Sequence, residues 1–174
     1  DIVLHLAAGS HVDRSIEYPL EFVQDNTVGT VNLLDYARKH LPNLERFVYF
    51  STDEIFGVAP PGVSYKEYDR YNSTNPYSAS KASGELLVRS YNRTHGLDVA
   101  ITRCSNNYGT HHFPEKLIPL FITNLLENKR IPVYGTGGNV RDWLHVDDHC
   151  QGVEKVLKLG KAGEIYNIGG GKEL

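Results

Sequence analysis

The stretch FVYFSTDEIFG, residues 47–57, joins an apolar run to four consecutive polar side chains, Ser51, Thr52, Asp53 and Glu54. Two hydroxyls and two carboxyl groups at the end of a predicted buried strand are suited to hydrogen bonding and acid–base chemistry. Adjacent residues on a non-helical segment point in different directions, so the two acids can address two neighbouring atoms of a substrate. A solvated turn is the alternative explanation, and these four residues alone do not exclude it.

Tyr77 and Lys81 form a Tyr-x-x-x-Lys pair that could supply a general base. The two residues are four positions apart in a predicted helix, so their side chains lie on one face. An ammonium group beside a phenol favours the phenolate, which predicts a pKa for Tyr77 below the ordinary value of about 10. Thr52 could hydrogen-bond the same substrate oxygen. An ordinary amphipathic helix explains the pair equally well when the pair is considered alone.

Short apolar strands alternate with amphipathic helices along the chain. Pro76 suits the first turn of one helix and Gly96 its C-cap, while Pro42 follows the basic end of another. This alternation predicts parallel β-α-β units, and hence an α/β fold with a Rossmann-type doubly wound parallel sheet. The predicted strands are 1–8, 46–51, 97–105 and 164–170, and the predicted helices are 22–41, 76–96, 114–129 and 146–160. The strand at 1–8 is expected to be buried on both faces.

Polar clusters follow three of the predicted strands: LAAGSH after the first, STDE after the second and CSNNYG after the third. In open α/β sheets, ligands bind beyond the carboxyl ends of the strands. We therefore expect a ligand-binding site at this edge of the sheet, although loops in general are polar.

The bulk composition is that of an ordinary globular domain. The 174 residues are 40% hydrophobic and 22% charged, with a formal net charge of -3. This balance gives no electrostatic reason to expect nucleic acid or an anionic membrane as a partner. No apolar run approaches the roughly 18 residues of a membrane span. Cys104 and Cys150 have neither a disulfide-framework nor a metal-binding spacing, so we expect reduced thiols and a cytoplasmic protein.

Six segments together resemble the dTDP-glucose 4,6-dehydratase branch of the extended short-chain dehydrogenase/reductase family. They are STDE, PYSASKAS, CSNNYG, FPEKLIPLFI, PVYGTGGNVRDWLHVDDH and GEIYNIGGG, and the resemblance extends over nearly the whole chain. The family's glycine-rich turn, which holds the NAD pyrophosphate, is not in this sequence, and there is no Met. We therefore expect an internal fragment that lacks the N-terminal β-α-β unit and has part of a smaller C-terminal substrate domain.

The resemblance implies dehydration of dTDP-glucose to dTDP-4-keto-6-deoxyglucose, with NAD regenerated in every cycle. Tyr77, assisted by Thr52, takes the proton of the sugar 4-hydroxyl while hydride passes from C4 to NAD. Glu54 then removes the C5 proton, Asp53 protonates the C6 hydroxyl that leaves as water, and hydride returns to C6. Lys81 completes the implied catalytic set.

The same resemblance implies binding residues in two regions, the C-terminal part of a NAD-binding Rossmann domain at 1–110 and part of a nucleotide-sugar-binding region at 111–174 that is interleaved with it. Lys116 and Arg141 suit a diphosphate because charge-assisted bonds to phosphate are strong, and Tyr134 could stack on or flank the thymine. A solvated helix face and a surface salt bridge are the alternative explanations for the two cations. The implied NAD contacts are Leu6, Ala7, Ala8, Ser10, Tyr77, Lys81 and Asn107. The implied nucleotide-sugar contacts are Ser10, Thr52, Asn106, Lys116, Leu117, Pro132, Tyr134 and Arg141.

Two positions depart from the family's pattern. Gly9 stands where the family usually has Glu, which is expected to loosen the loop beside the nicotinamide. Asp25 stands where Thr is usual, and a carboxylate near the cofactor is expected to weaken its binding. A metal site is not expected. His145 and His149 have the i, i+4 spacing of zinc ligands, but a third ligand and the Glu of an H-E-x-x-H motif are missing.

Two alternatives to the dehydratase remain open. One is another enzyme of the superfamily, such as a nucleotide-sugar 4-epimerase, which shares Tyr-x-x-x-Lys but does not need Asp53 and Glu54; a UDP-sugar dehydratase is a related possibility. The other is a non-catalytic fragment that binds nucleotide sugar weakly or not at all. Many family members dimerise through two helices, which would be those containing VGTVNLLDYARKH and Tyr77 here, so a homodimer is expected for the full-length enzyme.

Overall fold

The computed structural model describes residues 1–173, which form two compact units. The first unit contains residues 1–104 and 152–168, and the second contains residues 105–151 and the segment from Gly169 onward. The chain therefore leaves the first unit after the third strand of the main sheet and returns for its last strand. None of the helices within residues 1–173 is both long and apolar enough to cross a membrane.

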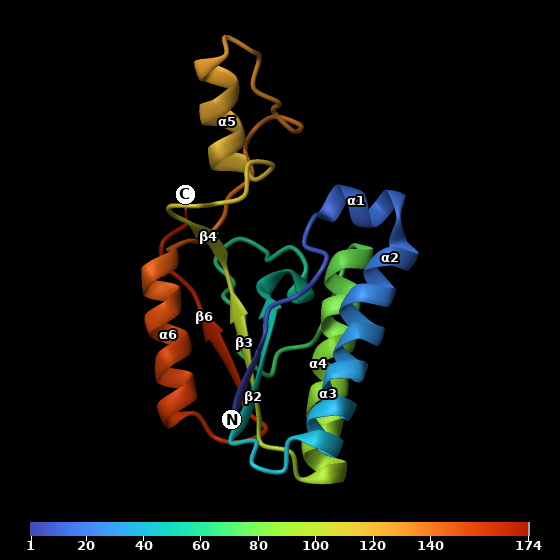
Figure 1. The fold of residues 1–174 in the computed structure, drawn as a ribbon. Helices are drawn as coiled ribbons and strands as arrows, with labels where there is room; N and C mark the ends of the chain where they lie inside the picture. The colour runs from blue at the N-terminus through green and yellow to red at the C-terminus, as the bar shows by residue number, and fades with distance from the viewer. Residues whose placement is uncertain (174) are drawn as a thin grey trace. The chain divides into compact units, whose positions relative to one another are not determined.

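The first unit is built on a parallel four-stranded sheet with the order β1-β2-β3-β6 (Figure 1). The strands are β1 (Ile2–His5), β2 (Arg46–Thr52), β3 (Val99–Cys104) and β6 (Ile165–Ile168). Thr52 pairs with Cys104, so β2 and β3 end at the same level. All four strands correspond to strands predicted from the sequence, and the prediction of a parallel α/β sheet is confirmed.

Helices cover both faces of this sheet, as expected for a doubly wound fold (Figure 1). On one face lie α3 (Gly29–His40) and α4 (Pro76–His95), and on the other lie residues 152–159 of α6 (Val146–Leu159). Side chains of β2 alternate between the faces, because successive residues of a strand point to opposite sides. Phe47 and Tyr49 pack with Leu34, Val88 and Ile101, whereas Val48 packs with Ala100 and Val156.

The prediction that the first strand is buried on both faces is wrong for the described chain. Ile2 is 52% exposed and Leu4 is 45% exposed. β1 pairs only with β2 and is an edge strand of the sheet, so a run of apolar residues is left partly open to solvent. An exposed apolar edge of this kind is an aggregation hazard.

The predicted helix 22–41 is part of a longer helical segment with an irregular turn. It contains α2 (Pro19–Val23), the π-helical turn Gln24–Val28 and α3 (Gly29–His40), and it is preceded by α1 (Val12–Glu17), which sequence reasoning missed. π-turns of this type often occur at functional sites. Here the turn carries Asn26, which is 1% exposed.

The second unit contains α5 and a small parallel sheet. β4 (Asn106–Tyr108) pairs with β5 (Trp143–His145), and α5 spans Leu117–Leu126. Pro119 is the third residue of α5, where its missing N–H leaves no gap in the hydrogen-bond ladder. The predicted helix 114–129 is longer at both ends than the observed one.

Candidate active site

The four polar residues at the end of β2 form a structured turn. Ser51 and Thr52 are the last residues of β2, and Asp53 and Glu54 begin a 3₁₀ helix, Asp53–Phe56. The Thr52 Oγ1 accepts a hydrogen bond from the Glu54 backbone N–H at 3.3 Å and lies 3.3 Å from Asp53 Oδ1. Thr52 therefore caps the short helix and fixes both acids, which are partly exposed at the carboxyl end of the strand.

Tyr77 and Lys81 lie in the first turns of α4. Asn75 is the N-cap of this helix, forms a capping box with Ser78, and precedes a proline in the first turn, as the sequence predicted for the helix start. Lys81 is only 4% exposed, and its Nζ lies 4.3 Å from the centroid of the Tyr49 ring. Burial lowers the pKa of Lys81 to about 8, against the opposing influence of Cys104 and Glu85.

Tyr77 lies close to the strand-end residues. Thr52 forms a hydrogen bond with the Tyr77 hydroxyl, and the negative charges of Asp53 and Glu54 influence the pKa of this hydroxyl. The structure thus brings Thr52, Asp53, Glu54 and Tyr77 together, although they come from two elements that are distant in sequence. Phe22 also contacts this group, with its ring edge-to-face against Tyr77 at 6.4 Å.

The prediction that Lys81 lowers the pKa of Tyr77 is wrong for this structure. Burial is the largest influence and raises the pKa of Tyr77 strongly, and Cys104, Glu54 and Asp53 raise it further. The Thr52 hydrogen bond opposes these effects, but Lys81 is not among the groups that act on the phenol. Its ammonium group lies over the Tyr49 ring instead.

The loop that follows β1 contains the predicted NAD contacts Leu6, Ala7, Ala8 and Ser10, all of which are exposed. Gly9 is tied down by Asn26, because its N–H donates to Asn26 Oδ1 at 2.8 Å and its carbonyl accepts from Asn26 Nδ2 at 3.0 Å. Asn26 Nδ2 also donates to Ser80 Oγ of α4 at 2.9 Å. The expectation that Gly9 loosens this loop therefore does not fit the structure, since Asn26 joins the loop to the helix that carries Tyr77.

A cavity of about 490 Å³ opens beside this loop. Ala7, Ala8 and Gly29 give it small side chains, and Asp25 contributes a carboxylate. The departure at position 25 thus faces the region where the resemblance implies NAD. The remaining residues that line the cavity are His5, Gln24, Asn32 and Leu33.

The residues of the first unit fit a dinucleotide in two respects. Small side chains let a ligand approach the backbone of the loop after β1. Lys81 is a buried ammonium that belongs to none of the ion pairs among residues 1–173. An ammonium is a donor only, so ribose hydroxyls are suitable partners for it. Ala7, Ala8, Ser10 and Lys81 are therefore the residues that would hold the cofactor in this unit.

In the second unit, Asn106 and Asn107 lie in β4. The Asn107 amide nitrogen lies 3.1 Å from His149 Nδ1, while burial lowers the pKa of His149, so the ring is neutral near pH 7. This contact orients the Asn107 amide. Its Oδ1 is buried without a hydrogen-bond partner among residues 1–173, which leaves an acceptor for a ligand.

The other predicted nucleotide-sugar contacts of the second unit are near α5 and in the long segment that follows it. Lys116 is the N-cap residue of α5, and Leu117 is its first residue. Arg141 is exposed, donates to its neighbour's carbonyl at 2.8 Å and forms no ion pair among the described residues, so the alternative of a salt bridge with a nearby Asp is not supported. Pro132 and Tyr134 are exposed.

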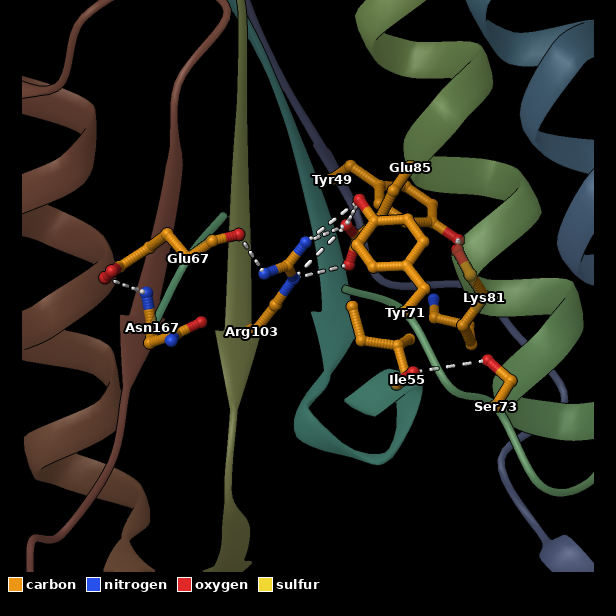
Figure 2. A network of polar contacts seen from close by, with 9 residues as sticks. All are labelled: Tyr49, Ile55, Glu67, Tyr71, Ser73, Lys81, Glu85, Arg103 and Asn167. Carbon is orange, nitrogen blue, oxygen red and sulfur yellow. Dashed lines mark hydrogen bonds and ion pairs between the residues drawn. The ribbon is translucent and has the colours of Figure 1, made fainter. Parts of the chain in front are cut away.

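Sequence reasoning missed a buried polar network between β3 and α4 (Figure 2). Arg103 of β3 donates to Glu85 of α4 at 2.6 Å, to the Tyr71 hydroxyl at 3.0 Å and to the Glu67 carbonyl at 2.7 Å. The guanidinium also lies 4.8 Å from the centroid of the Phe56 ring, in the short helix of Asp53 and Glu54. The network holds the segment between that helix and α4. An Arg within a mostly apolar strand is the only signal of it in the sequence.

The two histidines with zinc-like spacing have other contacts. The His145 ring lies edge-to-face against Tyr108 with ring centroids 5.1 Å apart, and His149 contacts Asn107. Within residues 1–173 there is no group of three or more His, Cys, Asp or Glu side chains placed to hold a metal ion.

Comparison with known proteins agrees with this geometry. A model of the NAD dependent epimerase/dehydratase family matches residues 1–169. The chain is 58% identical over 174 residues to the dTDP-glucose 4,6-dehydratase of Streptomyces antibioticus, covering 100% of the chain and 51% of the relative. It is 49% identical over 189 residues to dTDP-glucose 4,6-dehydratase 1 of Escherichia coli, covering 99% of the chain and 52% of the relative. The chain thus spans about half the length of these relatives.

Solved structures give the same result. The dTDP-glucose 4,6-dehydratase of Streptomyces venezuelae, crystallised with NAD and TYD bound, is 52% identical with a TM-score of 0.96, covering 100% of this chain and 53% of that one. A UDP-glucuronic acid 4-epimerase from Bacillus cereus, in complex with UDP-glucuronic acid and NAD, is 30% identical with a TM-score of 0.92. This match covers 100% of this chain and 55% of the epimerase chain. The epimerase is the more distant of the two in sequence.

Proposed function

The chain belongs to the NAD dependent epimerase/dehydratase family, and from this we propose that it carries the catalytic segment of a dTDP-glucose 4,6-dehydratase. The observation that carries the proposal is the position of Asp53 and Glu54. Both acids follow β2 directly and are held by Thr52, and their charges raise the pKa of the Tyr77 hydroxyl. A 4-epimerase needs Tyr77 and Lys81 but has no use for an acid and a base at two neighbouring carbons.

In the proposed reaction, this chain transfers protons at the 4-hydroxyl, C5 and the C6 hydroxyl, and C5 regains a proton when C6 is reduced. Tyr77 accepts the proton of the sugar 4-hydroxyl, with Thr52 hydrogen-bonded to the same oxygen. The ketone formed at C4 acidifies the C5 proton, which Glu54 removes. Asp53 gives a proton to the C6 hydroxyl, which leaves as water. General acid–base catalysis by positioned side chains typically contributes about 10²- to 10⁴-fold to such steps.

The proposed cofactor is NAD, which when bound supplies hydride acceptance at C4 and hydride return at C6. Burial keeps Tyr77 protonated in the present structure, so its role as a base requires a cation near the hydroxyl. Lys81 is the cation that the chain supplies on the same helix, one turn away. Ala7, Ala8 and Ser10 are proposed to contact the cofactor from the loop after β1, together with Leu6 and Asn107.

The proposed substrate is dTDP-glucose. The chain is 58% and 49% identical to two proteins that are named for this substrate, and it covers about half of their length. Lys116 and Arg141 are proposed to bind the diphosphate because both are cations, and Tyr134 to stack on or flank the thymine. Asn106, Leu117 and Pro132 complete the proposed sugar-nucleotide contacts of the second unit.

Incubation of the complete protein with NAD and dTDP-glucose tests this function. A dehydratase yields the 4-keto-6-deoxy product, detected by its absorbance in alkali and by mass. Formation of dTDP-galactose alone would favour the epimerase, and turnover of UDP-glucose in preference to dTDP-glucose would change the nucleotide. Absence of any turnover by the isolated 174-residue chain, with activity of the complete protein, would assign this chain as a non-catalytic fragment.

We also propose that the complete protein is a cytoplasmic homodimer that binds neither nucleic acid nor membranes. The net charge of -3 and the lack of a membrane-spanning helix within residues 1–173 support the second part. For the dimer, α3 and α4 pack side by side (Figure 1) and carry exposed apolar side chains: Tyr36 is 58% exposed and Leu86 55%. Exposed apolar side chains on two neighbouring helices suit a helix-bundle interface. The division into a NAD-binding region at 1–110 and a sugar-nucleotide region at 111–174 that is interleaved with it also remains a proposal.

A further inference from the structure

Asn75 connects the short helix that carries Glu54 with the helix that carries Tyr77. Its Nδ2 donates a hydrogen bond to Glu54 Oε2 at 3.2 Å, and its Oδ1 accepts one from the Ser78 N–H at 2.8 Å. Among residues 1–173, this is the one hydrogen bond that the Glu54 carboxylate accepts. The second carboxylate oxygen of Glu54 thus stays available for another partner.

The orientation of the Asn75 amide is fixed by the start of α4. Asn75 is the N-cap residue, and Ser78 is fully buried and completes a capping box with it. Because Oδ1 must face the helix N–H group, the amide nitrogen has to point away from the helix axis. Glu54 lies in that direction, so the cap determines where the donor to Glu54 is placed.

The residues just before α4 also contact the helix of Asp53 and Glu54. The backbone N–H of Asn72 donates to the Ile55 carbonyl at 2.8 Å, and the Ser73 hydroxyl lies 3.5 Å from the same oxygen (Figure 2). Gly57 ends the short helix with a φ of 73°, and a Cβ there would lie 2.5 Å from the Asn72 carbonyl oxygen. The contact between Asn75 and Glu54 therefore belongs to a tightly packed interface within the first unit.

We propose that Asn75 is a positioning residue that aims the Glu54 carboxylate relative to Tyr77. The inference rests on the proposed function, in which Glu54 takes the C5 proton after Tyr77 has taken the proton of the 4-hydroxyl. Holding one carboxylate oxygen leaves the other to accept the proton. Asn75 should therefore affect the elimination of water and not the preceding oxidation at C4.

Substitutions at position 75 separate this role from helix capping. Asn75→Ser and Asn75→Asp both retain a good N-cap, since Ser, Asp and Asn are about equally favourable there. Neither can donate to Glu54 as the amide does, because the Ser hydroxyl is too short and an ionised Asp has no proton. Ser90→Ala, at an exposed position of the same helix, serves as the matched control.

The experiment is a single turnover of dTDP-glucose by the complete protein with NAD, in which the nicotinamide absorbance reports oxidation as it rises and completion as it falls. We expect both Asn75 variants to oxidise C4 at a rate within about twofold of the wild type. We expect elimination to slow by about tenfold or more, the effect of losing one hydrogen bond to a charged group. Asn75→Ser should have no further effect on elimination when Glu54→Gln is already present.

Four results would overturn the proposal. Elimination at the wild-type rate in both variants would show that the contact has no role. An equal fall in the rates of oxidation and elimination would assign Asn75 to the folding of α4. The same would follow if the effects of Asn75→Ser and Glu54→Gln on elimination were additive in the double variant. Formation of no 4-keto-6-deoxy product by the wild-type protein would refute the proposed function, and the role of Asn75 with it.

Discussion

Arg103 and Glu85 form an ion pair at 2.6 Å in which both side chains are completely buried. The pair joins β3 to α4, and the Tyr71 hydroxyl, which lies 3.0 Å from Arg103, donates to Glu85 at 2.8 Å. It lies between the sheet and the helix whose first turns carry Tyr77 and Lys81 (Figure 2). The candidate site is therefore supported by charges that the catalytic proposal does not use.

Removing one member of this pair should destabilise the protein strongly. Glu85→Ala leaves the Arg103 guanidinium buried without its carboxylate, and loss of a partner in a buried pair typically costs about 3–5 kcal/mol. The double variant Arg103→Met, Glu85→Leu should be much more stable than the single one, because both charges are absent. Urea unfolding measures the difference.

The solvent-accessible pairs of Asp35 with Arg38 and Lys39 are the control for this experiment, since such surface ion pairs contribute little. Asp35→Asn should leave the unfolding midpoint unchanged. A single Glu85→Ala variant that is as stable as the double variant would show that the buried pair has no structural role.

His5 should make stability depend on pH. It is 4% exposed, its Nε2 lies 3.0 Å from Thr30 Oγ1, and burial, with a smaller effect of the Lys81 charge, lowers its pKa from 6.5 to about 4. The folded state then binds fewer protons than the unfolded state between these values. The contribution of the neutral His5 ring to the free energy of unfolding is fully present above pH 6.5 and is lost as the pH falls from 6.5 through 4. Its total is on the order of 3 kcal/mol.

The variant His5→Gln can still hydrogen-bond Thr30 but does not titrate. We expect the unfolding free energy of the wild type to fall more steeply between about pH 7 and pH 5 than that of this variant, by about 2 kcal/mol. His40→Gln, at an exposed position, should retain the wild-type slope. Equal slopes for the wild type and His5→Gln would contradict the assignment of a buried neutral imidazole.

Asp25 should weaken cofactor binding. Its side chain is exposed and lines the cavity together with Ala7 and Ala8, so a dinucleotide bound there would bring its phosphates or ribose near a carboxylate. Asp25→Thr should therefore lower the dissociation constant for NAD by roughly three- to tenfold, as expected for removing one like charge near a surface. Calorimetric titration of the complete protein with NAD measures the dissociation constant. Glu21→Gln, which removes an exposed acid one turn away, is the control.

An unchanged dissociation constant in Asp25→Thr, with normal binding in the control, would mean that NAD does not use this cavity. Weaker NAD binding by Asp25→Thr would indicate that the Asp25 carboxylate instead accepts a hydrogen bond from the ribose.

The sequence was sufficient to predict the main sheet and the helices that cover it. Pro76 and Gly96 marked the limits of α4 because their backbone preferences are local, and Gly96 indeed has a φ of 68°. α1 was missed because VDRSIE is polar and short. The strands β4 and β5 are only three residues long, and nothing in their composition distinguishes them from a loop.

The site was predictable as a set of residue types but not in its electrostatics. Thr52 and Tyr77 were linked because both hydroxyls could reach the same substrate oxygen, and the structure brings STDE and Tyr77 together. The pKa of Tyr77 depends on how deeply the phenol is buried and on where the Lys81 ammonium points, neither of which follows from spacing. The contacts of Asn75, Asn26 and Arg103 join segments distant in sequence, and their side chains gave no periodic signal.

The most direct test of the proposed catalytic roles is a single turnover of dTDP-glucose by the Glu54→Gln variant of the complete protein. The amide that replaces the carboxylate cannot accept the C5 proton, so we expect C4 oxidation at a rate close to that of the wild type, followed by accumulation of the oxidised sugar. Elimination should fall by at least about 10²-fold, the usual contribution of a general base. Full turnover to the 4-keto-6-deoxy product at the wild-type rate would contradict the assignment of Glu54 and with it the dehydratase mechanism.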